Sequence, residues 1–157
     1  NKELCSKKAE IIAKAANILG IPVIVTEQYP KGLGNTVEPL KSKLGDNVQY
    51  FEKTAFSALD NQDVLNALEK ANKKQVVILG IETHICVSQT TAALIKSGYE
   101  VNVIKDACGS RAETEYIAAL DRMKDNGAHI LTTEIALFEW LKGAKHPNFK
   151  DIQALIK

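Results

Sequence analysis

The chain has 157 residues, of which 45% are hydrophobic, and this is enough for one domain with a single sizeable core. Its 20 basic and 19 acidic side chains give a formal net charge of +1, so bulk charge offers no case for binding to nucleic acid or to a membrane. Three cysteines, with no signal-peptide pattern and no long apolar span, favour a reducing, cytoplasmic location.

The first residues predict a helix, a strand and a loop. Residues 1–19 have apolar side chains at helical spacing with lysines between them, and Gly20 ends the run, which indicates an amphipathic helix. Residues 21–25 are aliphatic apart from one proline near the start and predict a strand. Residues 26–34 are rich in glycine and proline, so they predict a loop at the carboxyl edge of a sheet, where binding residues commonly lie.

Residues 75–111 predict the centre of the fold. The unbroken apolar run at 76–79 is typical of a strand buried on both faces in a parallel sheet. From Cys86 the apolar residues recur at helical spacing until Gly98, and another strand follows at 101–104. In open parallel sheets, chemistry gathers where strand carboxyl ends meet helix amino ends, and Cys86 stands at such a place.

Cys86 is the first candidate site residue. A thiol in the first turn of a helix lies near unpaired backbone N–H groups and the positive end of the helix dipole, and both stabilise a thiolate over a thiol. The same N–H groups could hold the oxyanion that forms when a thiolate attacks a carbonyl. The alternative is that Cys86 is one more buried small apolar side chain, which is the commoner fate of a free cysteine.

The remaining segments continue the alternation of helices and strands. Further helices are predicted at 60–71, with Asp60 as a candidate N-cap, and at 113–126, 132–141 and 149–156, and further strands at 48–51 and 128–131. Asp106 precedes a Gly-Ser turn, so it is interpreted as a turn or cap residue in preference to a site residue. This order predicts one α/β domain over residues 1–157, with three layers (α/β/α) and a mainly parallel, Rossmann-like sheet.

Several blocks stand in order along the sequence. The central blocks read G-I-E-T-H-I-C-V, T-A-A, G-Y-E-V and D-A-C-G-S-R, and this set resembles the isochorismatase-like cysteine hydrolases. The upstream block T-E-Q-Y-P-K-G-L-G and the tail G-A-K-H-P-N-F-K-D-I-Q-A-L-I-K are similar to the isochorismatase domain-containing subgroup. The resemblance covers nearly the whole chain and implies a hydrolase that acts on a small amide or a related C–N or acyl substrate.

The resemblance also implies a catalytic trio of cysteine, lysine and aspartate. Cys86 falls on the nucleophile, and Lys53, in the block K-T-A-F-S, falls on the lysine, whose charge favours a nearby thiolate. Related hydrolases often have a cis peptide just before the cysteine, and the corresponding bond here is Ile81–Glu82. The other expected site residues, for substrate or oxyanion binding, come from that turn and from the upstream loop: Glu82, Thr83, Gln28 and Tyr29.

The chain departs from the family pattern in two places. The family has its aspartate at the end of a first, central strand, and no residue before Asn1 could form that strand, so we expect the domain to lack it. A shortened chain, an absent segment and a genuine loss of the strand all stay open, and Glu27 and Glu82 are the nearby carboxylates. The upstream block has no histidine where the nicotinamidase branch binds its metal, so we predict no metal and no other cofactor.

Two functions follow from these observations. One is a cysteine hydrolase that acts on a small-molecule substrate through a Cys-Lys-(Asp) site. The other, favoured by the missing aspartate, is a catalytically silent binding or scaffold protein with the same fold. A third interpretation, a nucleic-acid enzyme, is disfavoured by the near-zero net charge. The resemblance also implies self-association, so we expect a homo-oligomer with no nucleic-acid partner and no membrane partner.

Overall fold

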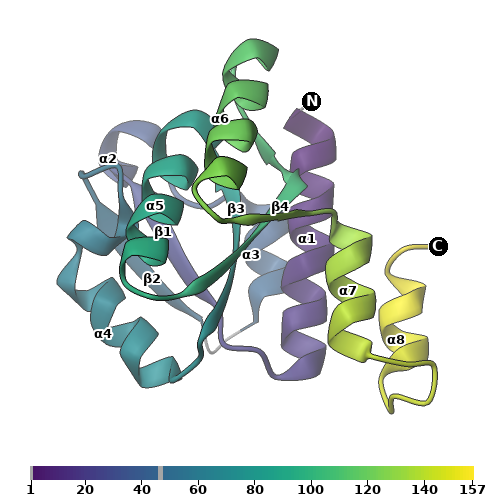
Figure 1. The fold of residues 1–157 in the computed structure, drawn as a ribbon. Helices are drawn as coiled ribbons and strands as arrows, with labels where there is room; N and C mark the ends of the chain where they lie inside the picture. The colour runs from purple at the N-terminus through teal and green to yellow at the C-terminus, as the bar shows by residue number, and fades with distance from the viewer. Residues whose placement is uncertain (1, 46–47) are drawn as a thin grey trace.

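Helices and strands alternate along the computed structural model, which describes residues 2–45 and 48–157 (Figure 1). The helices are α1 (Lys2–Leu19), α2 (Pro30–Leu33), α3 (Glu38–Leu44), α4 (Gln62–Ala71), α5 (Ser88–Lys96), α6 (Glu113–Asp125), α7 (Thr133–Leu141) and α8 (Phe149–Ala154). The strands are β1 (Ile24–Gln28), β2 (Gln49–Lys53), β3 (Gln75–Ile81), β4 (Glu100–Gly109) and β5 (His129–Leu131). There is also a 3-10 turn, η1 (Ala58–Asp60), and a π-helical turn, η2 (Thr83–Val87).

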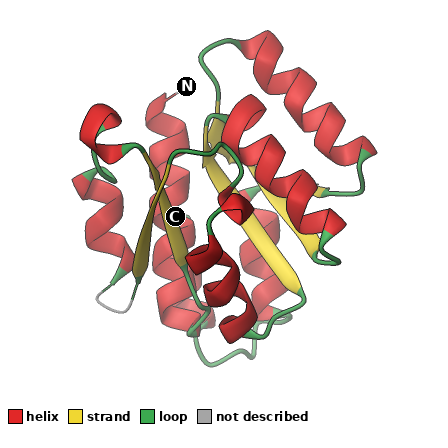
Figure 2. Ribbon diagram, turned by 90° about the vertical axis from the view of Figure 1, so that its left-hand side faces the viewer, coloured by secondary structure: helices red, strands yellow, loops and turns green. Residues whose placement is uncertain are grey.

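The described strands form two sheets in which every pair is parallel. β1 pairs with β2, and the other sheet has the order β3-β4-β5, with helices on both sides of the strands (Figure 2). The predicted α/β class and its parallel pairing are therefore confirmed. Residues 2–45 and 48–157 provide no strand that joins β1 to β3. Because β3 has a strand partner on one side, the apolar run at 76–79 contacts both cores but stays half-buried.

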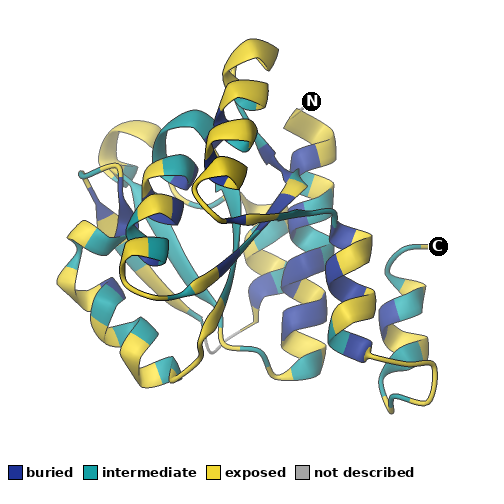
Figure 3. Ribbon diagram, in the orientation of Figure 1, coloured by how far each residue is buried: buried dark blue, intermediate teal, exposed yellow. Residues whose placement is uncertain are grey.

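β4 separates two hydrophobic clusters and gives the fold its layers (Figure 3). The first cluster packs β4 against α1, α7 and α8, and its members with no exposed surface are Ala15, Ile104, Ala107, Leu137 and Ile152. The second packs the opposite face against η2, α5 and α6 through Val87, Leu94, Val101, Val103, Cys108 and Met123. Burying one large aliphatic side chain contributes about 1.5–3 kcal/mol, so these clusters are the main source of stability for this sheet.

The end of α1 and the course of β1 differ from the sequence predictions. Gly20 adopts a positive φ of 64°, and the N–H of Ile21 donates to the carbonyl of Ala16, so Ile21 still completes the helix end and β1 begins only at Ile24. Residues 26–28, predicted as loop, pair in register with 51–53 and continue the strand. The parallel pairing, which local composition does not reveal, decides where this strand lies.

β4 also runs further than predicted. Its register against β3 shifts between Ile78 and Gly80, and beyond that irregularity it continues to Gly109, through residues predicted as loop. Asp106 lies in this stretch, and its Oδ1 accepts hydrogen bonds from the N–H (2.7 Å) and the hydroxyl (3.0 Å) of Thr133. Asp106 thus lies in a strand and not in the predicted turn, and α7 has Thr132 as its N-cap, but the Asp106 carboxylate satisfies a donor in the first turn of that helix.

Two helices add to or correct the sequence predictions. No helix was predicted at α3, a short helix with Pro39 in its first turn and Gly45 after its last. The N-cap of α4 is Asn61, whose Oδ1 accepts from the N–H groups of Asp63 and Val64, so the assignment of Asp60 as N-cap was wrong. None of the described helices has both the length and the apolar composition needed to cross a bilayer.

Candidate active site

Lys53 and Cys86 meet at the carboxyl ends of two strands that belong to different sheets. Lys53 is the last residue of β2, and Cys86 lies in η2, the turn between β3 and α5. The distance between Lys53 Nζ and Cys86 Sγ is 3.5 Å. The structure thus brings together two side chains that are 33 positions apart in the sequence.

The ammonium of Lys53 is buried in a cradle of oxygen atoms. The residue is 7% exposed, and Nζ donates to Gln28 Oε1 at 2.5 Å and to the carbonyls of Ala55 at 3.1 Å and Phe56 at 2.9 Å. Three oxygens match the three donors of an ammonium, and such bonding is what a buried cation requires. Cys86 Sγ is the fourth neighbour of this nitrogen.

Gln28 and Tyr29 lie next to Lys53, but they differ in what they contact. The Nε2 of Gln28 donates to the carbonyl of Thr54 at 2.7 Å, so both ends of its amide are engaged. The backbone N–H of Tyr29 donates to the carbonyl of Lys53 at 2.8 Å, while its side chain is 53% exposed. Tyr29 has a φ of 41°, and its ring lies so close to Gly32 that an added Cβ there would be 2.3 Å from a ring atom.

The turn before the nucleophile begins with the cis peptide Ile81–Glu82, as predicted. The carbonyl of Glu82 accepts hydrogen bonds from the N–H groups of Ile85 and Val87 at 3.2 and 3.3 Å. The Glu82 carboxylate binds Arg111 through its Nη2 at 2.6 Å, its Nε at 3.0 and 3.2 Å, and its backbone N–H at 3.2 Å. These hydrogen bonds from Arg111 hold the pKa of Glu82 below its usual value. The backbone of Glu82 therefore belongs to the turn before Cys86, whereas its side chain binds Arg111 just after the end of β4.

Thr83 and His84 occupy the same turn. Thr83 is fully buried, and its hydroxyl has no hydrogen-bond partner among the described residues. His84 Nδ1 lies 3.0 Å from the hydroxyl of Ser110, which follows β4. Together with the pair formed by Glu82 and Arg111, this contact ties the cysteine-bearing turn to the end of β4.

A second tie connects the helix after Cys86 with the segment after Lys53. The buried hydroxyl of Thr90 accepts a hydrogen bond from the N–H of Ala58 at 3.0 Å. Thr90 lies in α5, four positions after Cys86, a spacing that would put the two on one face of a regular α-helix and was the signal that could have identified Thr90 in the sequence. Sequence reasoning missed Thr90, His84 and Arg111.

Glu27, the other carboxylate considered from the sequence, holds the loop after β1. Its Oε1 accepts from the N–H of Thr36 and its Oε2 from Asn35 Nδ2, both at 2.7 Å. Partial burial raises the pKa of Glu27, but the bonds from Thr36 and Asn35 outweigh that effect and leave the pKa below its usual value. The oxygens of Glu27 are thus engaged with the loop, as those of Glu82 are with Arg111.

The three cysteines lie in different surroundings. Burial raises the pKa of Cys108 to about 12 and also raises that of Cys5, and both are buried in the core. Cys86 is half-buried and faces Lys53. In the part of the chain that the structure describes, no three or more His, Cys, Asp or Glu residues are placed to hold a metal ion together.

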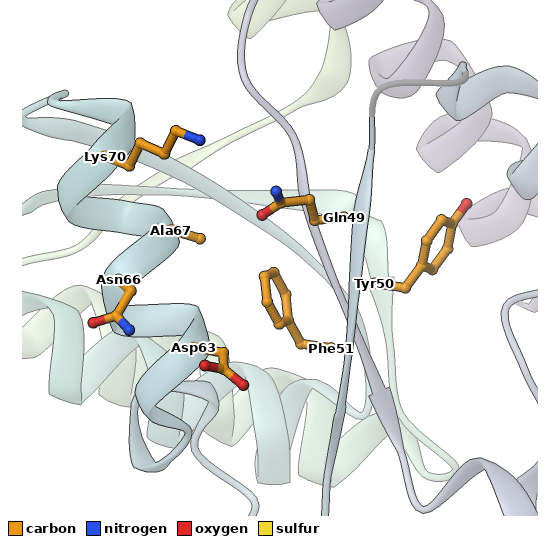
Figure 4. A pocket seen from close by; sticks show the side chains of 7 residues that line it. All are labelled: Gln49, Tyr50, Phe51, Asp63, Asn66, Ala67 and Lys70. Carbon is orange, nitrogen blue, oxygen red and sulfur yellow. The ribbon is translucent and has the colours of Figure 1, made fainter.

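A shallow hollow between β2 and α4 is separate from this site (Figure 4). Its lining residues are Gln49, Tyr50, Phe51, Asp63, Asn66, Ala67 and Lys70. Phe51 points across it toward α4, whereas Tyr50 points to the other side of the strand (Figure 4). Neither Lys53 nor Cys86 lines the hollow, so the chemistry of the site does not depend on it.

Comparison with known proteins decides the family. The isochorismatase domain matches residues 5–135. The chain belongs to the isochorismatase family. Isochorismatase family protein 1A of Dictyostelium discoideum is 44% identical, over 94% of this chain and 73% of its own length. Isochorismatase domain-containing protein 2 of Xenopus laevis is 40% identical, over 98% of this chain and 73% of its own length. The resemblance inferred from the sequence motifs is therefore confirmed.

Solved structures of the isochorismatase fold agree with this assignment. The MAR1 ribonuclease from Caenorhabditis elegans superposes with a TM-score of 0.94 at 41% identity, over 98% of this chain and 79% of its own. The YcaC gene product from Escherichia coli, an octameric hydrolase of unknown specificity, has a TM-score of 0.78 at 24% identity, over 99% of this chain and 82% of its own. At that identity the likeness to YcaC concerns the fold alone.

Proposed function

We propose that this isochorismatase-family chain is a cysteine hydrolase that acts on a small amide or a related C–N or acyl substrate. The main support is the 3.5 Å distance between Lys53 Nζ and Cys86 Sγ, together with the cradle that holds the ammonium. A cation at that distance favours the thiolate, which is the nucleophilic form of cysteine. Cys86 is half-buried, whereas Cys5 and Cys108 are buried.

In the proposed reaction, the Cys86 thiolate attacks the carbonyl carbon of the substrate. A bond forms between Sγ and this carbon, and the π electrons of the carbonyl move onto its oxygen. When the carbonyl re-forms, the C–N bond breaks, the amine leaves with the proton that the Cys86 thiol gave up on ionising, and a thioester remains on the enzyme. Water then adds to the thioester carbon, the C–S bond breaks, the acid is released, and a proton from the water restores the thiol.

Two further roles belong to the proposal. The backbone N–H groups of Cys86 and of Glu82 or a neighbouring turn residue such as Thr83 stabilise the oxyanion. Tyr29, whose backbone N–H is bonded to Lys53 and whose side chain is exposed, offers a surface for the substrate. The side chains of Glu27 and Glu82 are engaged with other groups, so we assign neither of them the role of proton acceptor.

Exposed apolar side chains bear on the assembly of the chain. Large apolar side chains on the outer face of α7, Ile135 and Phe138, remain 45% and 41% exposed. Such side chains suit a contact between subunits, and we propose a homo-oligomer, to be measured by light scattering coupled to size-exclusion chromatography. A cytoplasmic location stays a prediction from the sequence.

The test of the hydrolase proposal is acylation of Cys86 and its turnover. The purified protein is mixed with small amides and with an activated ester, and acyl adducts are followed by intact mass and peptide mapping. We expect an adduct at Cys86 and release of the acid, both lost in Cys86→Ser and both retained in Cys108→Ala, the matched control at a buried thiol. A folded protein whose Cys86 is neither acylated nor more reactive than a small free thiol would support the catalytically silent scaffold instead.

A second candidate function is RNA cleavage, because the C. elegans protein that is 41% identical to this chain is described as the MAR1 ribonuclease. The formal net charge of +1 gives this chain little general attraction to RNA. Incubation with single-stranded RNA, with Cys86→Ser in parallel, separates the two candidates. Cleavage that persists in Cys86→Ser would assign the RNA activity to another site.

A further inference from the structure

The amide of Gln28 is fixed at both ends beside the candidate nucleophile. Its Oε1 accepts from Lys53 Nζ at 2.5 Å, and its Nε2 donates to the carbonyl of Thr54 at 2.7 Å. The second bond orients the amide, because a carbonyl can only accept and must face the NH₂ end. The oxygen of Gln28 is therefore directed at the ammonium.

Gln28 differs from the other two acceptors in where it comes from. The carbonyls of Ala55 and Phe56 belong to the segment that directly follows Lys53 in the chain. Gln28 ends the neighbouring strand β1 and is the register partner of Lys53 in the parallel pair. Gln28 is thus the acceptor that binds the ammonium from a different strand than the one that carries Lys53.

All three oxygens around the ammonium belong to neutral groups. A neutral acceptor orients the ammonium but leaves its positive charge uncompensated by any of these three contacts. Among the described contacts of this nitrogen, the sulfur of Cys86, 3.5 Å away, is the one on which the ammonium could stabilise a negative charge. A carboxylate in place of the Gln28 amide would pair with the ammonium and compete with the thiolate for it.

We infer that Gln28 is a positioning residue, which holds the ammonium of Lys53 beside Cys86 and, because it is neutral, reserves the charge for the sulfur. This inference rests on the proposed hydrolase function, since it concerns the same lysine and cysteine. It goes beyond that function by giving Gln28 the role of positioning the ammonium of Lys53. A role in direct substrate binding was the expectation from sequence.

The experiment compares Gln28→Glu, which introduces a charge at nearly the same shape, with Gln28→Met, which removes the acceptor but keeps the length. The readout is the pH profile of iodoacetamide alkylation at Cys86, located by peptide mapping, together with the melting temperature of each variant. Lys53→Met and the double variant Lys53→Met/Gln28→Met complete a cycle that shows whether Gln28 acts through the lysine.

For Gln28→Glu we expect the pH of half-maximal alkylation to rise by about one unit, which is a roughly ten-fold loss of thiolate at a pH below both midpoints. Gln28→Met should shift it in the same direction by less, because the ammonium loses its external anchor. In the Lys53→Met background, Gln28→Met should produce no further shift.

Several outcomes would overturn the inference. If Gln28→Glu has the parent's profile and only a lower melting temperature, Gln28 fills space and does not tune the lysine. A downward shift in Gln28→Met would mean that the amide draws the ammonium away from the sulfur. The alkylation profile of the unsubstituted protein distinguishes a failure of this inference from a failure of the proposed hydrolase function. A parent profile like that of a small free thiol refutes the hydrolase proposal, whereas a lowered parent profile with no effect of Gln28→Glu refutes this inference alone.

Discussion

Replacing Lys53 by methionine is the most direct test of the site. Lys53→Met keeps an unbranched stem of similar length but removes the charge and the three donors of the ammonium. If the lysine stabilises the thiolate of Cys86, the variant must be brought to a higher pH to reach the same thiolate fraction. The expected size of that shift follows from the distance between the two atoms.

Two opposite unit charges 3.5 Å apart attract each other by about 1.2 kcal/mol at a dielectric constant of about 80 and by about 4.7 kcal/mol at about 20. Lys53 is 7% exposed, so the aqueous value is a lower bound, whereas Cys86 is half-buried, so the larger value is an upper bound. Since about 1.4 kcal/mol corresponds to a factor of ten, the thiolate available for alkylation at a given pH should fall by roughly ten-fold or more in the variant.

The measurement is the rate of iodoacetamide alkylation of Cys86 across pH. The position of the half-maximum is a better readout than the rate at one pH, because a less acidic thiolate is intrinsically more nucleophilic and this partly hides the loss. Lys73→Met, which removes the same charge from an exposed loop, is the matched control and should leave the profile unchanged. A half-maximum in Lys53→Met within a few tenths of a unit of the parent would refute the electrostatic role of the lysine.

Three further predictions concern the surroundings of the site. Because burial raises the pKa of Cys108 to about 12, iodoacetamide near neutral pH should modify Cys86 but reach Cys108 only in denaturant, as read by peptide mapping. Thr90→Val leaves the N–H of Ala58 buried without its acceptor, so the free energy of unfolding in urea should fall by about 1–3 kcal/mol, with recovery in Thr90→Ser. The pKa of Glu27 is lowered in the folded state, so its contribution is present above the usual value of 4.5 and is lost as the pH falls through the lower folded value. Glu27→Gln should therefore lose less stability than the parent on acidification in that range, by less than about 1 kcal/mol because Glu27 is only partly buried and solvent screens its contacts.

Most helices and strands could be predicted because their signals are local. Apolar spacing and end residues such as Gly20 and Gly98 lie within the segment that they describe. The errors occurred where distant pairing decides the structure. The end of β1 depends on residues 51–53, and the second half of β4 depends on a register shift against β3. No composition rule for residues 26–28 or 105–109 contains that information.

The site shows the same limit at the level of side chains. Cys86 could be identified because its place between a strand and a helix is visible in the sequence, whereas Lys53 required the family resemblance, since nothing near it distinguishes it from other lysines. Gln28 was expected at the site, but its contact with Lys53 depends on strand register, which the sequence did not supply. Thr90 acts through one hydrogen bond to a segment 32 positions away.

The distance between lysine and sulfur depends on how the two sheets are held together. Lys53 ends a strand of the β1-β2 sheet, and Cys86 follows β3 in the other, and the described residues provide no backbone pairing between the two. Packing between helices and strands holds the two sheets together instead. α1 contacts α3 as well as β3 and β4, and η1 contacts α5 where Thr90 binds Ala58. Because a contact already at 3.5 Å weakens quickly with any further separation, a displacement of about one ångström between the sheets would reduce the effect of the lysine on the sulfur. Substitutions at such contacts are therefore expected to change the reactivity of Cys86 together with stability, although they touch neither the lysine nor the cysteine.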